Sequence, residues 1–266
     1  MSFSLFGQTY NFGKSENQIL EAKKLATLKI QFFSESNHLL NTFAGFFIDN
    51  SGKIVTVNHT FKDDFSTTGK TKILVQDITG NTYSNISILG CGNKNELDLC
   101  ILQIKDLKPK SYFEASPLPR QANEPFTTIG HCKNKSTLEP FNVKKGKIIS
   151  IVEDYVVSTN DILNKLNLKT KLFTVDLDEC VGDSGSPVFN SFNGALLGTF
   201  SFFTKKSSAK KYNYYAIDAD EIKKFLIEVG DRKPFEIPLS RIYEEESECD
   251  KYKVGSREYE NCKTLE

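Results

Sequence analysis

A serine at the centre of a glycine-rich turn is the residue of this sequence best suited to chemistry. The turn reads Gly-Asp-Ser-Gly-Ser-Pro over residues 182–187, and the serine is Ser184. Glycines adopt backbone conformations that other residues rarely take, and they clear side chains from around the hydroxyl. Such a turn can point backbone N–H groups at the oxygen of a carbonyl that the serine attacks. The same residue types also make ordinary surface turns, which is the alternative on composition alone.

A nucleophilic serine needs a base, and the base needs a group that orients it. The chain has three histidines in all. His59 follows an alternating apolar run, and Asp98 stands at the start of a strongly apolar one. The order His59, Asp98, Ser184 therefore offers a base, an orienting acid and a nucleophile. The other two histidines, His38 and His131, are expected to be structural.

Three motifs in this order resemble the chymotrypsin-fold (trypsin-like) serine proteases. They are Val-Thr-Val-Asn-His at residues 55–59, Asp-Leu-Cys-Ile-Leu at residues 98–102 and the serine turn. The resemblance covers roughly residues 42–229, and its texture is closer to the Deg/HtrA and glutamyl-endopeptidase-like branches than to digestive trypsins. It implies an all-β fold of two six-stranded antiparallel β-barrels with a C-terminal helix. The PDZ domain of the Deg/HtrA branch has no room in the remaining length.

The resemblance also implies a serine endopeptidase that hydrolyses peptide bonds through an acyl-enzyme intermediate. Ser184 would attack the carbonyl, His59 would take the proton and later return it, and Asp98 would fix the imidazole tautomer. The N–H groups of Gly182 and Ser184 would form the oxyanion hole. No cofactor and no metal are expected. The alternative is a catalytically silent protein of the same fold that acts as a binding or scaffold module.

Asp183, directly before the serine, raises the question of activation. In trypsin-like zymogens this acid is neutralised by a new N-terminal amine after cleavage, and the chain has no Ile-Val-Gly-Gly sequence. Deg-like enzymes commonly carry Asn at this place. We therefore expect Asp183 to need a cationic or N–H partner, which the sequence does not identify. A requirement for activation stays open.

The resemblance indicates candidate substrate-binding residues but leaves the cleavage preference open. Asp178 stands six residues before the serine, where trypsin-like enzymes place the acid at the base of the primary pocket. That position favours Lys or Arg at the cleaved bond. Phe203 falls near a position that is glycine in open pockets, so its ring could shorten the pocket. Ser201 and Phe202, directly before it, are further candidates for the pocket. Asn213 is another expected wall residue, and small or apolar side chains are the alternative to basic ones.

The cysteines do not follow the pattern of secreted trypsin-like enzymes. The residue after His59 is Thr60, where those enzymes usually carry a bridged cysteine. Free thiols in a reducing compartment are therefore expected, although pairing of the last two cysteines stays open. Their spacing does not suggest a metal site. The six are Cys91, Cys100, Cys132, Cys180, Cys249 and Cys262.

Charge and hydropathy limit the kinds of molecule that the chain is expected to bind. The chain has 34 basic and 34 acidic residues, which argues against a general role on nucleic acid or a membrane surface. Its first residues show no signal peptide, and no apolar run reaches the about 18 residues of a membrane span. We expect a cytoplasmic protein, with secretion by another route as the alternative, whose partners are protein or peptide substrates.

The elements that must position the site follow from the apolar pattern. Phe and Tyr are plentiful, at 21 and 10, and β-branched and aromatic residues dominate the apolar set, which favours an all-β core. Residues 1–29 are expected to form an extension with a short helix, residues 30–230 the protease domain and residues 231–266 a charged tail. One predicted strand spans residues 82–89. The protease domain divides into a first barrel, a linker, a second barrel and a helix, expected at about residues 30–106, 107–123, 124–218 and 219–229.

Overall fold

The computed structural model describes most of the chain, in stretches separated by gaps. They are residues 4–5, 8–9, 14–34, 36–61, 72–92, 97–134, 137–152, 170–177, 182–205, 212–230 and 235–236. All belong to one compact unit, residues 1–236. Within them no helix is long and apolar enough to cross a membrane. Near the N-terminus, β1 (Ser4–Leu5) and β2 (Gln8–Thr9) pair with each other.

The helix α1 (Glu16–Ala26) begins with a capping box. The hydroxyl of Ser15 accepts the N–H of Gln18 at 3.3 Å, and the Gln18 side chain accepts the N–H of Ser15 at 2.9 Å. Together these bonds satisfy two N–H groups that have no partner inside the helix. Ile19 lies on the buried face of the helix. The first long strand starts at once, at Thr27, a few residues earlier than the sequence predicted.

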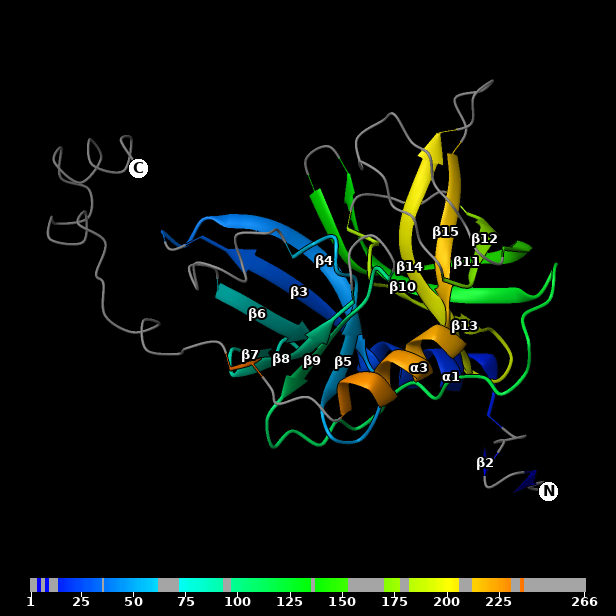
Figure 1. Ribbon diagram of the computed structural model, residues 1–266, viewed down its shortest axis with the longest axis horizontal. Helices are drawn as coiled ribbons and strands as arrows, with labels where there is room; N and C mark the ends of the chain where they lie inside the picture. The colour runs from blue at the N-terminus through cyan, green and yellow to red at the C-terminus, as the bar shows by residue number, and fades with distance from the viewer. Residues whose placement is uncertain are drawn as a thin grey trace, which may run out of the picture. The chain divides into compact units, whose positions relative to one another are not determined.

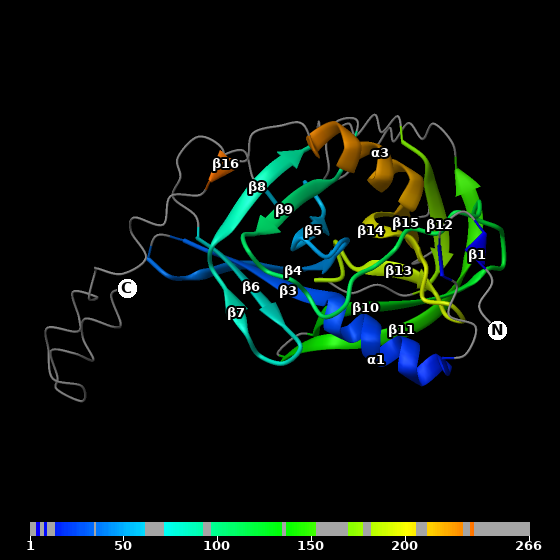
Figure 2. The same cartoon turned by 90° about the horizontal axis from the view of Figure 1, so that it is seen from below.

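An antiparallel sheet of eight strands makes the first half of the domain (Figure 1). Its strand order is β16-β8-β9-β5-β4-β3-β6-β7, and Figure 2 shows it curling round from β8 to β7. Along β3, Leu28, Ile30 and Phe32 are buried, as expected for a strand with one face on the core. The bounds are β3 (Thr27–Phe33), β4 (Leu39–Phe47), β5 (Lys53–Thr56), β6 (Lys72–Asp77), β7 (Thr82–Tyr83), β8 (Ile86–Cys91), β9 (Cys100–Ile104) and β16 (Phe235–Glu236).

Two differences from the predicted first barrel concern its edges. The strand predicted over residues 82–89 is two strands, because β7 pairs with β6 whereas β8 pairs with β9 across the sheet. The strand β16 adds to β8, with Phe235 opposite Ile88, so part of the predicted tail joins the sheet. The all-β double-barrel fold with a C-terminal helix is confirmed, but the first half is an eight-stranded sheet and not a six-stranded barrel.

The second half is a closed barrel of six strands in the order β10-β11-β12-β15-β14-β13. Large apolar side chains fill it, among them the fully buried Phe126, Phe173 and Phe200. Burial of this apolar surface is the main stabilising contribution to such a barrel. The bounds are β10 (Pro125–Asn134), β11 (Thr137–Val152), β12 (Leu172–Asp176), β13 (Pro187–Asn190), β14 (Leu196–Lys205) and β15 (Tyr212–Asp218).

The connection between the two halves packs one aromatic ring against both. Phe113 is fully buried, and its ring centroid lies 5.2 Å from that of Phe46 on β4 and 5.4 Å from that of Phe189 on β13. The N–H of Phe113 donates to Phe47 at 2.8 Å, and that of Ser116 donates to Leu196 at 2.8 Å. The connection thus links β4 of the first half with β13, the strand that follows the serine turn.

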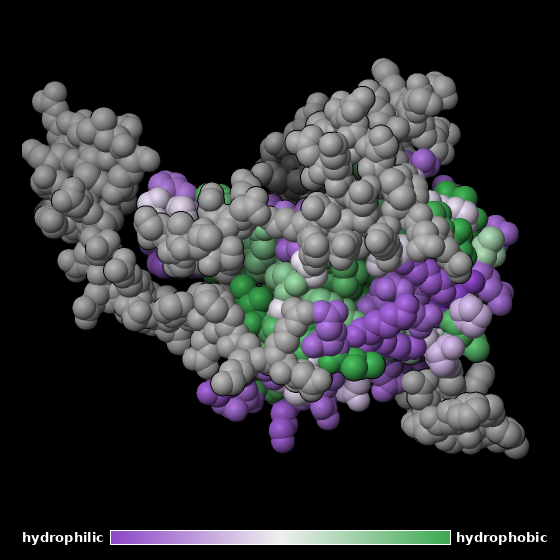
Figure 3. All heavy atoms as spheres, viewed as in Figure 1, coloured by the Kyte–Doolittle hydropathy of each residue, from purple (hydrophilic) through white to green (hydrophobic). Residues whose placement is uncertain are grey.

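The helix α3 (Ala219–Gly230) is amphipathic, with Ile222, Phe225 and Val229 among its buried residues. Figure 3 shows hydrophilic side chains gathered over the region of this helix. Its first turn carries Asp220 and Glu221, whose negative charges interact favourably with the positive end of the helix dipole.

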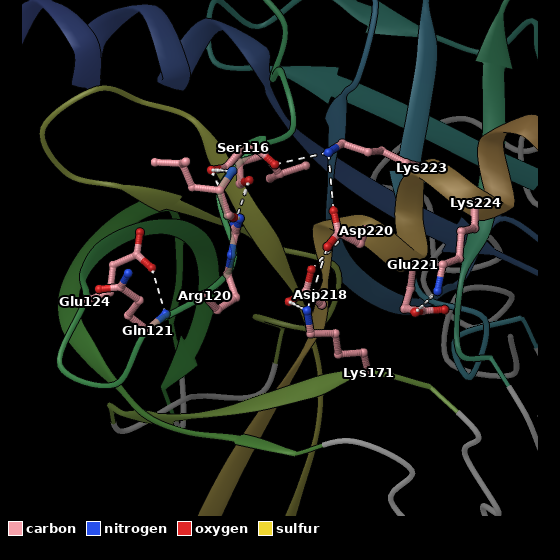
Figure 4. Close-up of polar contacts among 12 residues, drawn as sticks. Ser116, Arg120, Gln121, Glu124, Lys171, Asp218, Asp220, Glu221, Lys223 and Lys224 are labelled. Carbon is pink, nitrogen blue, oxygen red and sulfur yellow. Dashed lines mark hydrogen bonds and ion pairs between the residues drawn. The ribbon is translucent and has the colours of Figure 1, made fainter.

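A polar network anchors the start of α3 (Figure 4). Asp218 is fully buried, and burial raises its pKa although nearby Arg120 and Lys171 act in the opposite direction. The ammonium of Lys171 lies 3.6 Å from Asp218 and 3.7 Å from Asp220. Lys223 of the helix donates to the carbonyl of Ser116 at 3.1 Å. The helix is therefore tied both to the second barrel and to the connection between the halves.

A disulfide joins Cys91 and Cys100, so the prediction of free thiols is wrong for this pair. The two residues lie directly opposite each other on β8 and β9, with their Cα atoms 4.0 Å apart. This removes one of the arguments for a cytoplasmic location, which stays a prediction. The structure does not describe the side chain of Cys132. Three further cysteines lie outside the described residues, and so does the pairing considered for the last two: Cys180, Cys249 and Cys262.

Candidate active site

Two neighbouring strands and one turn bring the three predicted catalytic side chains together. The strands β5 and β9 pair antiparallel with Thr56 opposite Cys100. His59 follows β5 and Asp98 precedes β9, so both emerge at the same end of the sheet. Ser184 lies in the turn that leads into β13 of the second barrel. The site is therefore assembled between the two halves of the domain.

The three side chains form a line of close contacts. The Nε2 atom of His59 lies 3.2 Å from the Oγ atom of Ser184. On the other side of the ring, Nδ1 lies 2.7 Å from Oδ2 of Asp98. The Asp98 side chain is only 2 % exposed, whereas that of His59 is 27 % exposed. A buried acid thus contacts a histidine whose ring reaches solvent next to a serine hydroxyl.

Ser201 stands behind this line, although the resemblance implied a place in the substrate pocket. Its hydroxyl donates to Oδ2 of Asp98, the atom that also faces the histidine ring. Ser201 is itself 2 % exposed. The oxygens of a buried carboxylate need hydrogen-bond partners in place of water. Ser201 therefore supports the acid of the site.

The pKa of His59 is raised above its ordinary value of 6.5. Burial of the ring acts to lower it, but the charge of Asp98 and the hydrogen bond to Asp98 act together in the opposite direction and prevail. The imidazolium form is therefore stabilised at this place. A histidine that must hold a proton for part of a reaction is helped by such a neighbour.

The turn around Ser184 has a conformation that its glycines make possible. The φ angle of Gly182 is 106° and that of Gly185 is 83°, both in the region that favours glycine. A Cβ atom on Gly182 would lie 2.0 Å from the carbonyl oxygen of His131, and one on Gly185 would lie 2.1 Å from that of Ala44. The N–H of Ala44 also donates to the carbonyl of Ser184 at 2.9 Å. The turn is therefore seated tightly against β4 and β10.

The two N–H groups predicted for the oxyanion hole belong to this turn. Among the described residues, the N–H of Gly182 and that of Ser184 donate to no backbone carbonyl. The carbonyl of Asp183, between them, accepts the N–H of Ser186 at 2.9 Å, which closes the turn. Neither N–H group is therefore used by a backbone carbonyl within the described part of the chain, as the predicted oxyanion hole requires.

Asp183 has the cationic partner that the sequence could not identify. The ammonium of Lys144, on β11, lies 2.5 Å from Oδ2 of Asp183. The side chain of Asp183 is 3 % exposed and that of Lys144 is 16 % exposed. Gly130 on β10 lies against the same carboxylate, since a Cβ atom there would lie 2.0 Å from Oδ1. The sequence offered no signal for this pair, because the two residues are far apart in the chain and the lysine is one of three in a short stretch.

The other two histidines take no part in the line of side chains. His131 is fully buried beneath the serine turn, with Nε2 2.9 Å from the carbonyl of Leu28 and Nδ1 accepting the N–H of Phe141 at 3.1 Å. Burial lowers the pKa of His131 to about 4, with the Leu28 carbonyl acting in the opposite direction. His38 lies exposed, with Nδ1 2.9 Å from the hydroxyl of Ser36.

The remaining candidates for substrate binding lie on β14 and β15 or outside the described residues. Phe202 is buried and stacks on Tyr215, with ring centroids 4.9 Å apart. Phe203 is 53 % exposed, and its ring centroid lies 6.0 Å from that of Tyr214. Asn213 is partly buried and pairs across the sheet with the residue after Phe203. Asp178 lies outside the described residues.

The three side chains in contact define the chemistry that the site can perform. The described residues hold no group of three or more His, Cys, Asp or Glu that could bind a metal ion. The chemistry available at the site is that of a hydroxyl, an imidazole and a carboxylate in contact. This arrangement can activate the hydroxyl as a nucleophile.

Comparisons with known proteins indicate a family and a fold for this chain. A family model described as Trypsin matches residues 25–226. No curated protein gave a match. The active form of the Rv3671c protease from M. tuberculosis has 16% identity and a TM-score of 0.62, covering 83% of this chain and 88% of that chain. The inactive form of a serine-to-alanine mutant of Rv3671c from M. tuberculosis H37Rv has 18% identity and a TM-score of 0.58, covering 80% of this chain and 91% of that chain. At these identities the likeness shows the fold alone.

Proposed function

Since this chain belongs to the trypsin family, we propose that it is a serine endopeptidase that acts through Ser184, His59 and Asp98. The observation that carries the proposal is the continuous line from the serine hydroxyl to the buried carboxylate, at 3.2 Å and 2.7 Å. The membership of the Deg/HtrA-like branches within the family stays a prediction.

In the first half of the proposed reaction the serine forms an ester with the substrate. The Oγ atom of Ser184 attacks the carbonyl carbon of the peptide bond while Nε2 of His59 takes the hydroxyl proton. The carbonyl oxygen becomes an oxyanion, which the N–H groups of Gly182 and Ser184 stabilise; one such donor contributes about 3 kcal/mol to lowering the barrier. The C–N bond then breaks as His59 gives its proton to the leaving amine, and an acyl-enzyme remains.

In the second half, water takes the place of the amine. His59 removes a proton from the water, the resulting hydroxide attacks the ester, and the proton passes to Oγ of Ser184 as the ester bond breaks. Asp98 stays ionised throughout, supported by Ser201, and stabilises the imidazolium that forms in each half.

The proposed substrates are proteins or peptides, and the residue preferred at the cleaved bond has two candidates. A basic preference depends on Asp178, whereas a small or apolar preference depends on the ring of Phe203 beside Tyr214. A peptide-library profile of wild type beside Asp178→Asn and Phe203→Gly separates them. Loss of a Lys or Arg preference in the first variant supports the basic pocket. New acceptance of large side chains in the second supports the restricted one.

The second candidate function is the silent protein of the same fold. Nothing in a purely binding role requires the three side chains to be in contact, so the line of contacts favours the enzyme. A fluorophosphonate probe, which reacts with activated serines, separates the two. We expect a single adduct on Ser184 in the wild type and none in Ser184→Ala. A folded wild-type protein that stays unlabelled would favour the silent module.

A further inference from the structure

We propose that Lys144 is a positioning residue that holds the serine turn in its competent conformation, so that the chain is reactive without being cleaved. This inference rests on the proposed function. It identifies Lys144 as a positive charge within the chain that the proposed activity needs. The starting observation is the contact of 2.5 Å between the ammonium of Lys144 and Oδ2 of Asp183, the residue directly before Ser184.

Because Asp183 is buried, its contact with the Lys144 ammonium stabilises the carboxylate strongly. The carboxylate is 3 % exposed, so it has lost nearly all of its contact with water. An ionised carboxylate without a partner at such a place is strongly unfavourable, and removal of one member of a buried ion pair is far more damaging than removal of an exposed one. Loss of the Lys144 ammonium removes a stabilising partner of this buried carboxylate and so favours rotation of Asp183 toward solvent.

The paired strands β10 and β11 form the site that holds the Asp183 carboxylate. Gly130 of β10 leaves the space, because a Cβ atom there would lie 2.0 Å from Oδ1 of Asp183 and 2.8 Å from the hydroxyl of Ser186. The register of β10 on β11 puts Lys144 opposite Thr128, two residues before that glycine. The strand pair thus supplies both the space and the charge.

His131, a second titratable group beside the turn, does not supply the positive charge. His131 lies next to Gly130 and is held neutral by its two hydrogen-bond partners, since Leu28 accepts from Nε2 and Phe141 donates to Nδ1. The burial of this ring also lowers its pKa to about 4.

The position of Asp183 connects this pair to the reactive groups. Asp183 lies between Gly182 and Ser184, whose N–H groups form the proposed oxyanion hole, and its own carbonyl closes the turn on Ser186. A rotation of Asp183 toward solvent therefore moves both N–H groups and the serine at once. Because Lys144 belongs to the chain itself, no new N-terminal amine is needed to prevent that rotation.

The test compares the rate at which a fluorophosphonate probe labels Ser184 in four uncleaved, purified proteins. They are the wild type, Lys144→Met, Lys144→Arg and the matched control Lys145→Met. Lys145 is the next residue of the same strand, and its side chain is 59% exposed and paired with Glu16. Mass spectrometry of the intact chain establishes that each sample is uncleaved, and circular dichroism gives the folded fraction by which each rate is divided.

We expect the uncleaved wild type to react and Lys144→Met to react at least 100-fold more slowly per folded molecule. Lys144→Arg restores the cation, and its labelling rate should lie within about tenfold of the wild-type rate. The control Lys145→Met should react at the wild-type rate. With a peptide substrate, the loss in Lys144→Met should fall mainly on kcat. A merely structural role would lower the folded fraction and leave the rate per folded molecule unchanged.

Two results contradict the inference without touching the proposed function. One is a Lys144→Met protein that reacts at the wild-type rate, and the other is a wild type that reacts only after cleavage creates a new N-terminus. A wild type that is unreactive in every form contradicts the proposed function itself. If Lys144→Met does not fold, the inference is tested with the double variant Asp183→Asn/Lys144→Met, which removes both charges. We expect it to fold and to react within about tenfold of the wild type, and a folded but unreactive double variant would contradict the inference.

Discussion

Asp98 holds His59 at two atoms: its Oδ1 accepts the backbone N–H of His59, and its Oδ2 faces the ring Nδ1, each at 2.7 Å. Because an ionised carboxylate can only accept, Nδ1 carries the proton of the neutral ring. The other nitrogen, Nε2, then turns its lone pair toward the hydroxyl of Ser184. One buried side chain thus fixes both the place and the tautomer of the proposed base.

The substitution Asp98→Asn tests this arrangement. The amide nitrogen of asparagine donates, so it can hold the ring in the opposite tautomer and leave Nε2 protonated toward the serine. We expect kcat to fall by about 10³- to 10⁴-fold, while the protein stays folded. Steady-state kinetics and thermal unfolding of both proteins check this. A loss smaller than tenfold in a folded variant would show that Asp98 does not set the tautomer.

The raised pKa of His59 predicts the pH dependence of activity. The base must be neutral to accept the proton from Ser184, so kcat/KM falls as the pH drops through the pKa of His59. Since the charge and hydrogen bond of Asp98 hold that pKa above 6.5, the acidic midpoint should lie above pH 6.5. A profile measured from pH 5 to 9 gives the midpoint directly. A midpoint clearly below 6.5 would mean that burial of the ring outweighs the carboxylate.

The buried His131 predicts the pH dependence of stability. Its pKa is about 4 in the folded protein against an ordinary value of 6.5, so the unfolded chain binds a proton that the folded chain rejects. The stability that it contributes is complete above pH 6.5 and is lost as the pH falls toward 4. The free energy of unfolding should drop by roughly 3 kcal/mol between pH 7 and pH 4 from this group. Urea unfolding of His131→Gln, which has no such proton, should lack this part of the decrease.

The disulfide between Cys91 and Cys100 predicts sensitivity to reductant. Closing a loop with a sequence separation of 9 lowers the entropy of the unfolded chain, a stabilisation of roughly 2–3 kcal/mol. Thermal unfolding with and without a strong reductant should therefore give a lower Tm in the reduced sample. The variant Cys91→Ser/Cys100→Ser serves as the control and should show no further decrease. An equal decrease in that variant would place the redox effect elsewhere in the chain.

The proposed catalytic residues could be predicted from sequence because each lies in a local pattern. His59 ends an alternating strand, Asp98 begins another, and Ser184 stands between glycines whose positive φ angles the structure shows to be needed on either side. Strand pairing then brings the first two together without any further information.

The supporting residues could not be predicted, because they depend on which face of a strand meets which turn. Lys144 and Lys145 are neighbours of identical type, yet the first pairs with the buried Asp183 and the second with the exposed Glu16. Composition and charge cannot distinguish them. The sequence makes Ser201 a candidate for the substrate pocket but gives no sign that its hydroxyl contacts Asp98.

The disulfide was missed for a related reason. A strand predicted to end at Leu89 leaves Cys91 in a loop, whereas β8 continues to Cys91 through an irregularity between Ile88 and Gly90. That continuation sets Cys91 opposite Cys100 on β9. Irregular pairing of this kind is a property of two strands together, so it is not visible in the pattern of one.

The most direct test of the central claim is proteolysis of an unfolded protein by the wild type beside Ser184→Ala, with the new N-termini identified by mass spectrometry. The account predicts that the wild type produces new N-termini at internal peptide bonds and that the variant, prepared in the same way, produces none. Equal cleavage by the two proteins would contradict the role of Ser184. The absence of cleavage by a folded wild type would contradict the assignment as a serine endopeptidase.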